Sequence, residues 1–427
     1  LSRIKDTDGM MVSFIHEGSC ITVREDISGK KMYLNHDSAG RLVSITDDTG
    51  RQTSLNYDEK NRMVSYTNPV GVTITYTYDD RNRILTEANP QGVYVTNEYD
   101  TEGRVIRQKD ALGAVSTLQY ATDANGMTTT ITDVDGTTKK VITDNKGNII
   151  KVINANGSTI EYAYDSKGNM ICEKDSYGNC ILKEYDAKGL LLSMTDTGNQ
   201  KTTFTYDAKG NVKTVTGPNG ETAKYEYNKQ NKMISYKDLN GITTTYEYDT
   251  NGLLIRQNVE GLGSICYSYE NGRPVRMTDY LGNVTYTEYD ARGNLIKTTD
   301  ALGNTVSYTY DELGRMLGTT DAMGNKTTYT YDCNNRVLSE KDALGNTTRY
   351  VYDKAGNRTA VIYADGTETK YWYDAKGNLT KTVYADGTQH SSTYDSEGNI
   401  VKEVLKDGTV LTYTYDLLNQ RVSETDA

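Results

Sequence analysis

A 21-residue repeat runs through this 427-residue chain and constrains its fold more than any other feature. The stretch Asp300–Thr320, DALGNTVSYTYDELGRMLGTT, is followed at once by DAMGNKTTYTYD, which begins the same pattern again. Nineteen copies align on a Tyr-Asp pair; one has a two-residue insertion at Ala121-Thr122 and another, at Glu270–Gly272, is one residue short. Periods of this length indicate a repeat protein, in which each unit buries its surface only against its neighbours.

Two tight turns are predicted in every repeat. The turn after the acidic residue contains Gly in 14 copies, three positions on in 13 of them and two positions on in the short copy, and Asn three positions on in the other five; these two residue types tolerate positive φ. A second turn, of the form DALG or YADG, follows about ten residues later and always contains Gly. The Asp that starts a turn can accept backbone N–H groups. The five copies with Asn have it at Asn61, Asn82, Asn231, Asn335 and Asn419.

The segments between the turns have the pattern of β-strands. One is rich in Thr, Val and Tyr with period-two alternation, as in Thr305–Tyr310, and the other begins with an apolar pair such as Leu295-Ile296. The sequence therefore predicts an all-β fold of tandem antiparallel hairpins, each of about 21 residues, in one long coiled sheet. Two Tyr residues spaced two apart project from one face, where they can form an aromatic ladder with the apolar pairs.

Composition narrows the possible functions. Hydrophobic residues make up 36% of the chain and the mean hydropathy is −0.68, so a thin β-structure is favoured over a thick core. The net charge of −11 argues against nucleic acid or an anionic membrane as the main partner. No apolar run approaches the roughly 20 residues of a membrane helix.

No catalytic or cofactor-binding constellation stands out. The three His residues are far apart in the repeat order, which disfavours a His-based triad. Asp6 with Asp8, and Asp133 with Asp135, are weak calcium candidates, but neither pair has the ligand spacing of a known calcium loop, and turn capping is favoured. The sequence therefore predicts no enzyme activity, no cofactor and no metal.

The five Cys residues, Cys20, Cys172, Cys180, Cys266 and Cys333, lack the spacing of a metal site. Cys172 and Cys180 flank one predicted turn, which leaves a cross-strand disulfide open. Buried free thiols are the favoured interpretation, because Cys is commonly buried.

The Y-x-Y-D-x-x-G-[N/R] core resembles the YD-repeat, or Rhs-repeat, family over about residues 30–427. That family includes bacterial Rhs polymorphic toxins, wall-associated repeat proteins, the B and C components of insecticidal toxin complexes, and teneurins. The residues that carry the resemblance most clearly are Tyr308, Tyr310, Asp311, Gly314, Tyr329, Tyr331, Asp332, Tyr350, Tyr352, Asp353, Gly356, Tyr371, Tyr373, Asp374 and Gly377. The resemblance implies hairpins that form part of a hollow spiral shell.

The family resemblance also sets the functional expectation. Residues 1–29 are interpreted as a degenerate start and residues 30–427 as one repeat domain, excised from a longer, secreted or cell-surface protein. The absence of any Asp-Pro dipeptide disfavours the self-cleaving segment of Rhs toxins within this stretch. The expected role is a non-catalytic shell that encapsulates or presents a C-terminal effector domain of the same parent. The alternative is a cell-wall or glycan-binding module that uses exposed Tyr.

Overall fold

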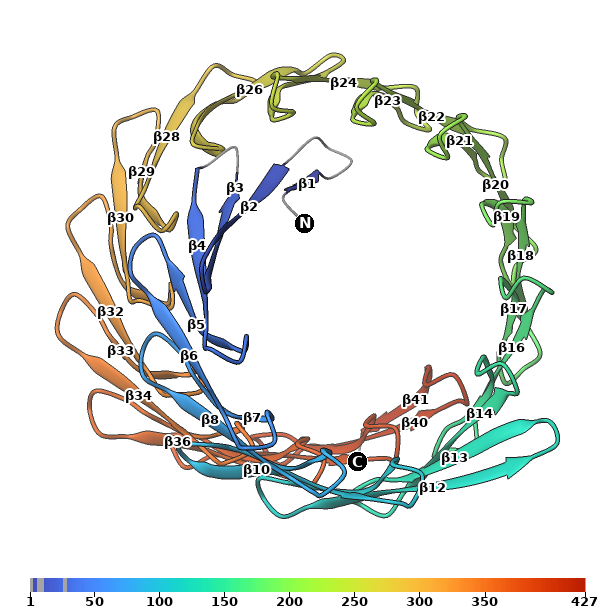
Figure 1. Cartoon of the computed structure of the whole chain (residues 1–427). Helices are drawn as coiled ribbons and strands as arrows, with labels where there is room; N and C mark the ends of the chain where they lie inside the picture. The colour runs from blue at the N-terminus through green and yellow to red at the C-terminus, as the bar shows by residue number, and fades with distance from the viewer. Residues whose placement is uncertain (1–2, 6–10, 26–28, 427) are drawn as a thin grey trace. The chain divides into compact units, whose positions relative to one another are not determined.

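The computed structural model describes residues 3–5, 11–25 and 29–426, and over these residues the chain is all-β with 41 strands and no helix. The predicted fold class is confirmed. The chain divides into two units: one comprises residues 1–73, 201–330 and 342–344, and the other residues 74–200, 331–341 and 345–427. Within each unit, strands that are neighbours in sequence pair antiparallel, and the hairpins follow one another along the ribbon (Figure 1).

The first twenty strands are β1 (Arg3–Lys5), β2 (Met11–Glu17), β3 (Cys20–Glu25), β4 (Lys31–His36), β5 (Leu42–Asp47), β6 (Gln52–Tyr57), β7 (Met63–Thr67), β8 (Thr73–Tyr78), β9 (Ile84–Asn89), β10 (Gly92–Tyr99), β11 (Val105–Asp110), β12 (Val115–Asp123), β13 (Gly126–Thr132), β14 (Thr138–Asp144), β15 (Ile149–Ile153), β16 (Thr159–Tyr164), β17 (Met170–Lys174), β18 (Cys180–Tyr185), β19 (Leu191–Thr195) and β20 (Lys201–Tyr206). The remaining strands are β21 (Val212–Thr216), β22 (Thr222–Tyr227), β23 (Met233–Lys237), β24 (Thr243–Tyr248), β25 (Leu254–Val259), β26 (Gly263–Glu270), β27 (Arg273–Thr278), β28 (Val284–Tyr289), β29 (Leu295–Thr299), β30 (Thr305–Tyr310), β31 (Met316–Thr320), β32 (Lys326–Tyr331), β33 (Val337–Lys341), β34 (Thr347–Tyr352), β35 (Arg358–Ile362), β36 (Glu368–Tyr373), β37 (Leu379–Val383), β38 (Gln389–Tyr394), β39 (Ile400–Val404), β40 (Val410–Tyr415) and β41 (Arg421–Asp426).

The turn after each Tyr-Asp pair, called the YD turn below, has the same backbone bonds in nearly every repeat. At Asp58 the backbone N–H donates to the carbonyl of Arg62, and the N–H of Asn61 donates back to the Asp58 carbonyl. Asn61 has φ of 63°, and the other four Asn residues at this position have φ between 60° and 65°. The strand register shifts at the adjoining Tyr. This is a type I turn followed by a left-handed residue that forms a bulge, which explains the restriction to Gly or Asn.

Some turns depart from this pattern, among them the copy with the insertion, in which Asp123 pairs directly with Gly126. The short copy closes with a two-residue loop, in which Glu270 pairs with Arg273 and both Asn271 and Gly272 have positive φ. A loop of this type matches the right-handed twist of the flanking strands, so losing one residue preserves the hairpin. In the second turn at 196–199 the left-handed residue is Asn199, with φ of 61°, and not the preceding Gly.

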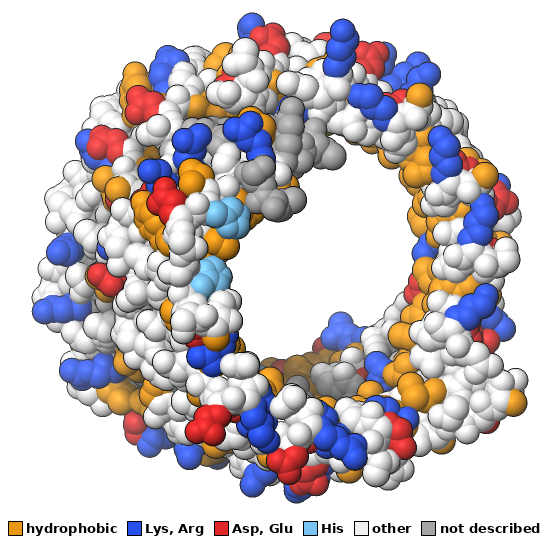
Figure 2. All heavy atoms as spheres, in the orientation of Figure 1, with side chains coloured by type: hydrophobic (Ala, Val, Ile, Leu, Met, Phe, Trp, Pro, Cys, Tyr) orange, Lys and Arg blue, Asp and Glu red, His pale blue; other side chains and the backbone are white. Residues whose placement is uncertain are grey.

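The sheet has little fully buried core, as the low hydropathy predicts. The buried hydrophobic residues of the described chain are Val152, Ala223, Ala360 and Val361. Along β24 the two Tyr side chains are half-buried and the Glu between them is exposed, so the predicted alternation of faces is present. Near β16–β19, hydrophobic side chains gather along one face of the ribbon and charged side chains lie elsewhere (Figure 2). Stability therefore depends on contacts between adjacent repeats.

Candidate functional site

The Asp of the YD turn organises its own turn. In Asp311, one carboxylate oxygen accepts the backbone N–H groups of Leu313 and Arg315, and the other accepts the Arg315 Nε at 2.6 Å. In Asp165 the same second oxygen accepts the amide of Asn169 at 2.8 Å. Arg and Asn are therefore equivalent at this position with respect to the Asp, which accounts for the alternation of Arg and Asn in the repeats.

These contacts hold the turn carboxylates in their charged form. In Asp58 the backbone N–H of Arg62 is the main cause of a lowered pKa; burial opposes it, and the Arg62 side chain lowers the pKa further. In Asp165 the Asn169 side chain is the main cause of the lowered pKa. A carboxylate that accepts several hydrogen bonds is stabilised in its ionised state. The turn Asp residues with a lowered pKa, such as Asp58 and Asp165, therefore have a structural role as anions.

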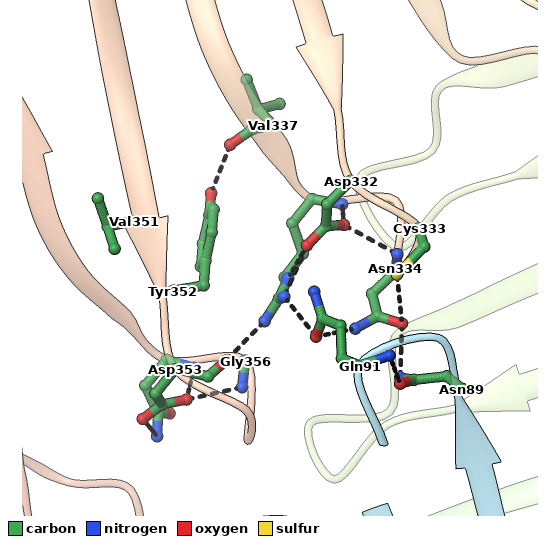
Figure 3. A network of polar contacts seen from close by, with 12 residues as sticks. Asn89, Gln91, Asp332, Cys333, Asn334, Val337, Val351, Tyr352, Asp353 and Gly356 are labelled. Atoms are coloured by element: carbon green, nitrogen blue, oxygen red, sulfur yellow. Dashed lines mark hydrogen bonds and ion pairs between the residues drawn. The ribbon is translucent and has the colours of Figure 1, made fainter. Parts of the chain in front are cut away.

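In most repeats the Tyr that precedes the Asp fastens the repeat to the one before it. The Tyr352 hydroxyl donates to the backbone carbonyl of Val337, the first residue of β33, at 3.0 Å (Figure 3). The same bond to the carbonyl of the residue 15 positions earlier occurs in at least eleven repeats of the described chain, with distances of 2.6 to 3.0 Å between the hydroxyl and carbonyl oxygens. These repeats carry Tyr57, Tyr99, Tyr120, Tyr164, Tyr185, Tyr248, Tyr269, Tyr352, Tyr373, Tyr394 and Tyr415. A Phe could not make this bond.

Arg336 connects three parts of the chain. It binds the carboxylate of Asp332 in its own turn, lies over the Tyr352 ring at 4.7 Å, and donates to the carbonyl of Asp353 at 3.1 Å in the next repeat. It also donates to the side-chain oxygen of Gln91 at 3.2 Å, some 245 residues earlier in the chain. An Arg at the end of the YD turn therefore links neighbouring repeats, and here it also links two distant stretches of the ribbon.

In the second unit, which comprises residues 74–200, 331–341 and 345–427, turns from distant stretches of the chain contact each other. The Asn334 side chain of a YD turn bonds Asn89 and Gln91 of a second turn at 3.0 and 3.1 Å. Lys376 binds Asp135 at 2.7 Å, and the backbone N–H of Asn156 donates to Glu397 at 2.9 Å. The backbone N–H of Leu417 donates to the Tyr177 hydroxyl. Each contact joins a second turn of the earlier stretch to a YD turn of the later stretch.

The other unit contains the same kind of contact. Arg292, in a YD turn, donates from Nε to the Thr49 hydroxyl at 3.3 Å, and Arg51 donates to the Glu312 carbonyl at 3.0 Å. Lys30 donates to the Arg292 carbonyl at 2.6 Å. The sequence separations in both units are 239–245 residues, or about one repeat more at 261–263. A separation of 241 residues is about eleven and a half repeats. Because the two kinds of turn alternate about every half repeat, this offset places a second turn of one stretch next to a YD turn of the other.

The third residue of each turn makes most of these contacts. On the second-turn side the third residues are Thr49, Gln91, Asp135, Asn156 and Tyr177. On the YD-turn side they are Arg292, Asn334, Lys376 and Glu397, while Leu417 is the second residue of its turn. The third position is therefore the interface position of both turns. Sequence reasoning missed it, because opposite charges such as those of Asp135 and Lys376 identify a pair only once the offset between the two stretches is known.

The Tyr-Asp residues singled out from the sequence lie at corresponding places in consecutive hairpins. Their Tyr pairs are the fourth and sixth residues of β30, β32, β34 and β36, and the Asp follows each strand directly. Gly314, Gly356 and Gly377 have φ of 78°, 100° and 86°. The Tyr rings of these strands are half-buried, and many hydroxyls are bonded to the backbone. This placement favours a packing ladder over a surface that stacks on sugars.

The candidate ion sites have other partners or lie outside the described residues. Asp135 pairs with Lys376, and the Asp133 carboxylate is 4.0 Å from the same ammonium. Asp6 and Asp8 lie outside the described residues. Over the described part of the chain, no three His, Cys, Asp or Glu side chains are grouped as metal ligands would be. No helix of the described residues is long and apolar enough to cross a membrane.

A cavity of about 890 Å³ lies in the first unit. Its charged lining includes Lys30, Asp48, Arg273 and Asp290, and the lining contains neither His nor Cys. The cavity is a groove of mixed charge.

One pair of Cys residues forms a disulfide, whereas the sequence favoured buried free thiols. Cys172 and Cys180 form a disulfide across the hairpin of β17 and β18, with their Cα atoms 6.0 Å apart. Free thiols were therefore the wrong interpretation for these two residues. Cys20, Cys266 and Cys333 are free thiols and are half-buried. The strand pairing places Cys172 and Cys180 on adjacent strands within reach of each other, which sequence alone left open.

Comparison with known families gives a consistent result along the chain. A family model described as Teneurin YD-shell matches residues 25–183 and 181–329. A second, described as RHS Repeat, matches residues 334–368, 359–389 and 394–427. The comparison with curated proteins found no match.

Several solved structures have a similar fold. One is a TcdB2-TccC3 complex without its hypervariable C-terminal region, with a TM-score of 0.71, 16% identity and coverage of 98% of this chain. Another is TcdB2-TccC3-TEV, with a TM-score of 0.59, 16% identity and 97% coverage. A third, the Photorhabdus luminescens Tc holotoxin pore, has a TM-score of 0.52 at 14% identity and 97% coverage. The chain spans only 26–27% of the length of these solved chains.

Proposed function

The chain belongs to the YD-shell and RHS-repeat family, and on that premise we propose that it is a structural, non-catalytic segment of a β-shell. The proposal rests on the observation that the polar groups of the repeat bond to other parts of the same chain. Tyr hydroxyls fasten consecutive hairpins, turn Asp carboxylates hold their own turns, and third-position residues join distant stretches. Polar groups that bond to neighbouring repeats stabilise the shell wall, and few of them remain to bind a substrate.

We infer further that the shell encloses or presents a C-terminal effector domain of the same parent polypeptide, outside the cell or at its surface. A hypervariable C-terminal region is named for one toxin complex of similar fold, and such a region is where an effector would stand. The thin wall, with both faces largely in contact with water, supports confinement of a passenger without a specific binding site. The net charge of −11 gives no support for nucleic acid as the passenger.

The test uses the complete parent protein. If its reading frame encodes a non-repetitive domain after these repeats, we expect that domain to resist protease in the parent and to be digested when expressed alone. Equal digestion of the two forms contradicts enclosure. A reading frame that continues only into a wall anchor contradicts the effector proposal and favours adhesion.

A further inference from the structure

The cavity of about 890 Å³ in the first unit lies where the repeat departs from its own pattern. The short YD turn contributes Glu270 and Asn271 to the lining. The next repeat contributes Tyr286, at a position where most repeats have Thr, Ser or a charged residue. Lys30 and Asp48 line the cavity from the earlier stretch of the ribbon. A place where a regular chain breaks its local rule is a place to look for function.

Tyr286 is not part of the Tyr ladder. The ladder residues stand one and three positions before the acidic residue, whereas Tyr286 stands four positions before Asp290. Because strand residues alternate between faces, its ring lies on the face opposite that of Tyr289. The ring is 51% exposed, and its hydroxyl has no hydrogen-bond partner among the described residues. Thr245 and Thr328 hold the equivalent position in other repeats, so the fold does not require an aromatic ring there.

Arg276, the cross-strand neighbour of Tyr286, lacks the acidic partner that equivalent Arg residues have. An Arg at this strand position elsewhere pairs with a Glu, as Arg107 does with Glu98 at 2.5 Å between guanidinium and carboxylate. The residue that pairs with Arg276 on its other side is Ser268, which also lines the cavity. The half-buried guanidinium of Arg276 makes no hydrogen bond or ion pair with any described residue. It is therefore available to an anionic ligand.

The acidic side chains of the lining, in contrast, are engaged. Asp290 accepts the backbone and side-chain N–H groups of Asn294, and Lys297 binds Glu288 at 2.8 Å. The two remaining acids and the cations next to them are Asp48 with Lys30 and Glu270 with its strand partner Arg273. Carboxylates bound in this way keep lone pairs that can accept ligand hydroxyl groups. The lining therefore suits a ligand that is rich in hydroxyls and carries an anionic group.

We propose that this cavity binds an acidic oligosaccharide, with a uronic acid carboxylate on Arg276 and a neighbouring sugar ring against Tyr286. A guanidinium holds a carboxylate through two parallel N–H donors. An exposed Tyr ring offers an apolar face for the C–H groups of a sugar and a hydroxyl for hydrogen bonding. The volume of about 890 Å³ is within the range of small-ligand sites. This binding activity goes beyond the shell role and does not require an enclosed effector.

Calorimetric titration of the whole chain with trigalacturonic acid tests the proposal. We expect a dissociation constant on the order of 0.1 mM at low ionic strength, weakened by added salt because one charge pair contributes to binding. Maltotriose has sugar rings without carboxylates, and tricarballylate has carboxylates without rings. Each should bind at least about tenfold more weakly than trigalacturonic acid. Equal binding of either comparison compound, or no binding of trigalacturonic acid up to about 10 mM, overturns the proposal.

Two variants remove the available charge in different ways. Arg276→Gln deletes the guanidinium charge, and Ser268→Glu supplies the cross-strand acid that Arg107 has in Glu98. Both should weaken trigalacturonic acid binding at least about tenfold, and Ser268→Glu should do so without lowering the melting temperature, because it adds an ion pair. Arg107→Gln is the matched control, because Arg107 holds the same strand position in the other unit, and it should bind as the unmodified chain does. Unchanged affinity in both Arg276→Gln and Ser268→Glu overturns the proposal.

A third variant tests the aromatic contact. Tyr286→Thr introduces the residue that Thr245 and Thr328 provide at the equivalent position, so the strand keeps a residue that the repeat already uses. We expect it to weaken trigalacturonic acid binding about threefold to tenfold and to leave tricarballylate binding unchanged, because only the sugar ring contacts the Tyr. Equal loss for both compounds, or no loss for trigalacturonic acid, contradicts the placement of the sugar ring on Tyr286.

Discussion

Replacing Tyr352 by Phe removes one hydroxyl from the bond that joins two consecutive hairpins. The hydroxyl donates to the Val337 carbonyl at 3.0 Å, and the ring lies beneath Arg336 at 4.7 Å. Phe keeps the ring and its contact with Arg336. The expected loss is that of one neutral hydrogen bond, about 0.5–1.5 kcal/mol, near the middle of that range because the carbonyl is only partly buried and water can reach it.

Tyr289 offers a matched control. Its ring also lies under an Arg, with Arg273 at 5.8 Å. The carbonyl 15 residues earlier, on Pro274, accepts the Thr287 hydroxyl instead, and no hydrogen bond joins the Tyr289 hydroxyl to another described residue. Tyr289→Phe should therefore change stability by no more than about 0.5 kcal/mol.

Native-state hydrogen exchange is the appropriate assay, because repeat proteins open locally and a single global midpoint dilutes the effect. A loss of about 1 kcal/mol raises exchange about fivefold, and we expect this rise in peptides from β33 and β34 of Tyr352→Phe. The corresponding peptides of Tyr289→Phe, from β27 and β28, should be unchanged. Equal effects in both variants, or no effect in either, would refute the assignment of the hydroxyl bond as the fastening element.

The remaining predictions concern a turn and the acid response. Gly303→Val should destabilise by more than about 1 kcal/mol, because Gly303 has φ of 86° and a Cβ added there would meet no atom within 4 Å, so the cost is backbone strain alone. Gly303→Asn should cost less in the same melting experiment, since Asn199 adopts a positive φ in an equivalent turn, and equal melting of wild type and both variants contradicts the turn geometry. For Asp135, burial acts to raise the pKa, but hydrogen bonds from Lys376 and Thr137 outweigh it and hold the pKa at about 2. The folded-state pKa lies below the unfolded value of about 3.9, so this stabilisation is present above about pH 4 and is lost as the pH falls toward 2. Denaturant midpoints that stay constant from pH 5 to pH 2 contradict it.

The local fold was predictable from the sequence because every repeat contains the same turn and strand pattern. The restriction to Gly or Asn predicted positive φ at Asn61 and its four counterparts, and all five have it. The alternation in strands such as β24 predicted which side chains share a face. Short-range rules suffice for these features, since a turn type depends on a few neighbouring residues.

The long-range contacts were not predictable from the same rules. The offset of about eleven and a half repeats depends on the small twist and coil between successive strands, which no single repeat encodes. The pairing of Asp135 with Lys376 follows only once that offset is known. The Tyr hydroxyl bond to a carbonyl 15 residues earlier also requires the strand register, because a ladder of rings alone would be satisfied by Phe.

The measurement that tests the central claim most directly is zero-length carbodiimide cross-linking of the unmodified chain, read by mass spectrometry. The account predicts an amide between Lys376 and Asp135, whose Nζ and Oδ2 atoms are 2.7 Å apart, and its loss in Lys376→Arg, which keeps the charge but lacks the amine. Lys151 and Glu161, 2.8 Å apart on adjacent strands, provide the internal positive control. Recovery of the Lys151–Glu161 cross-link without the Lys376–Asp135 cross-link would contradict a wall built by docking one stretch of ribbon onto another.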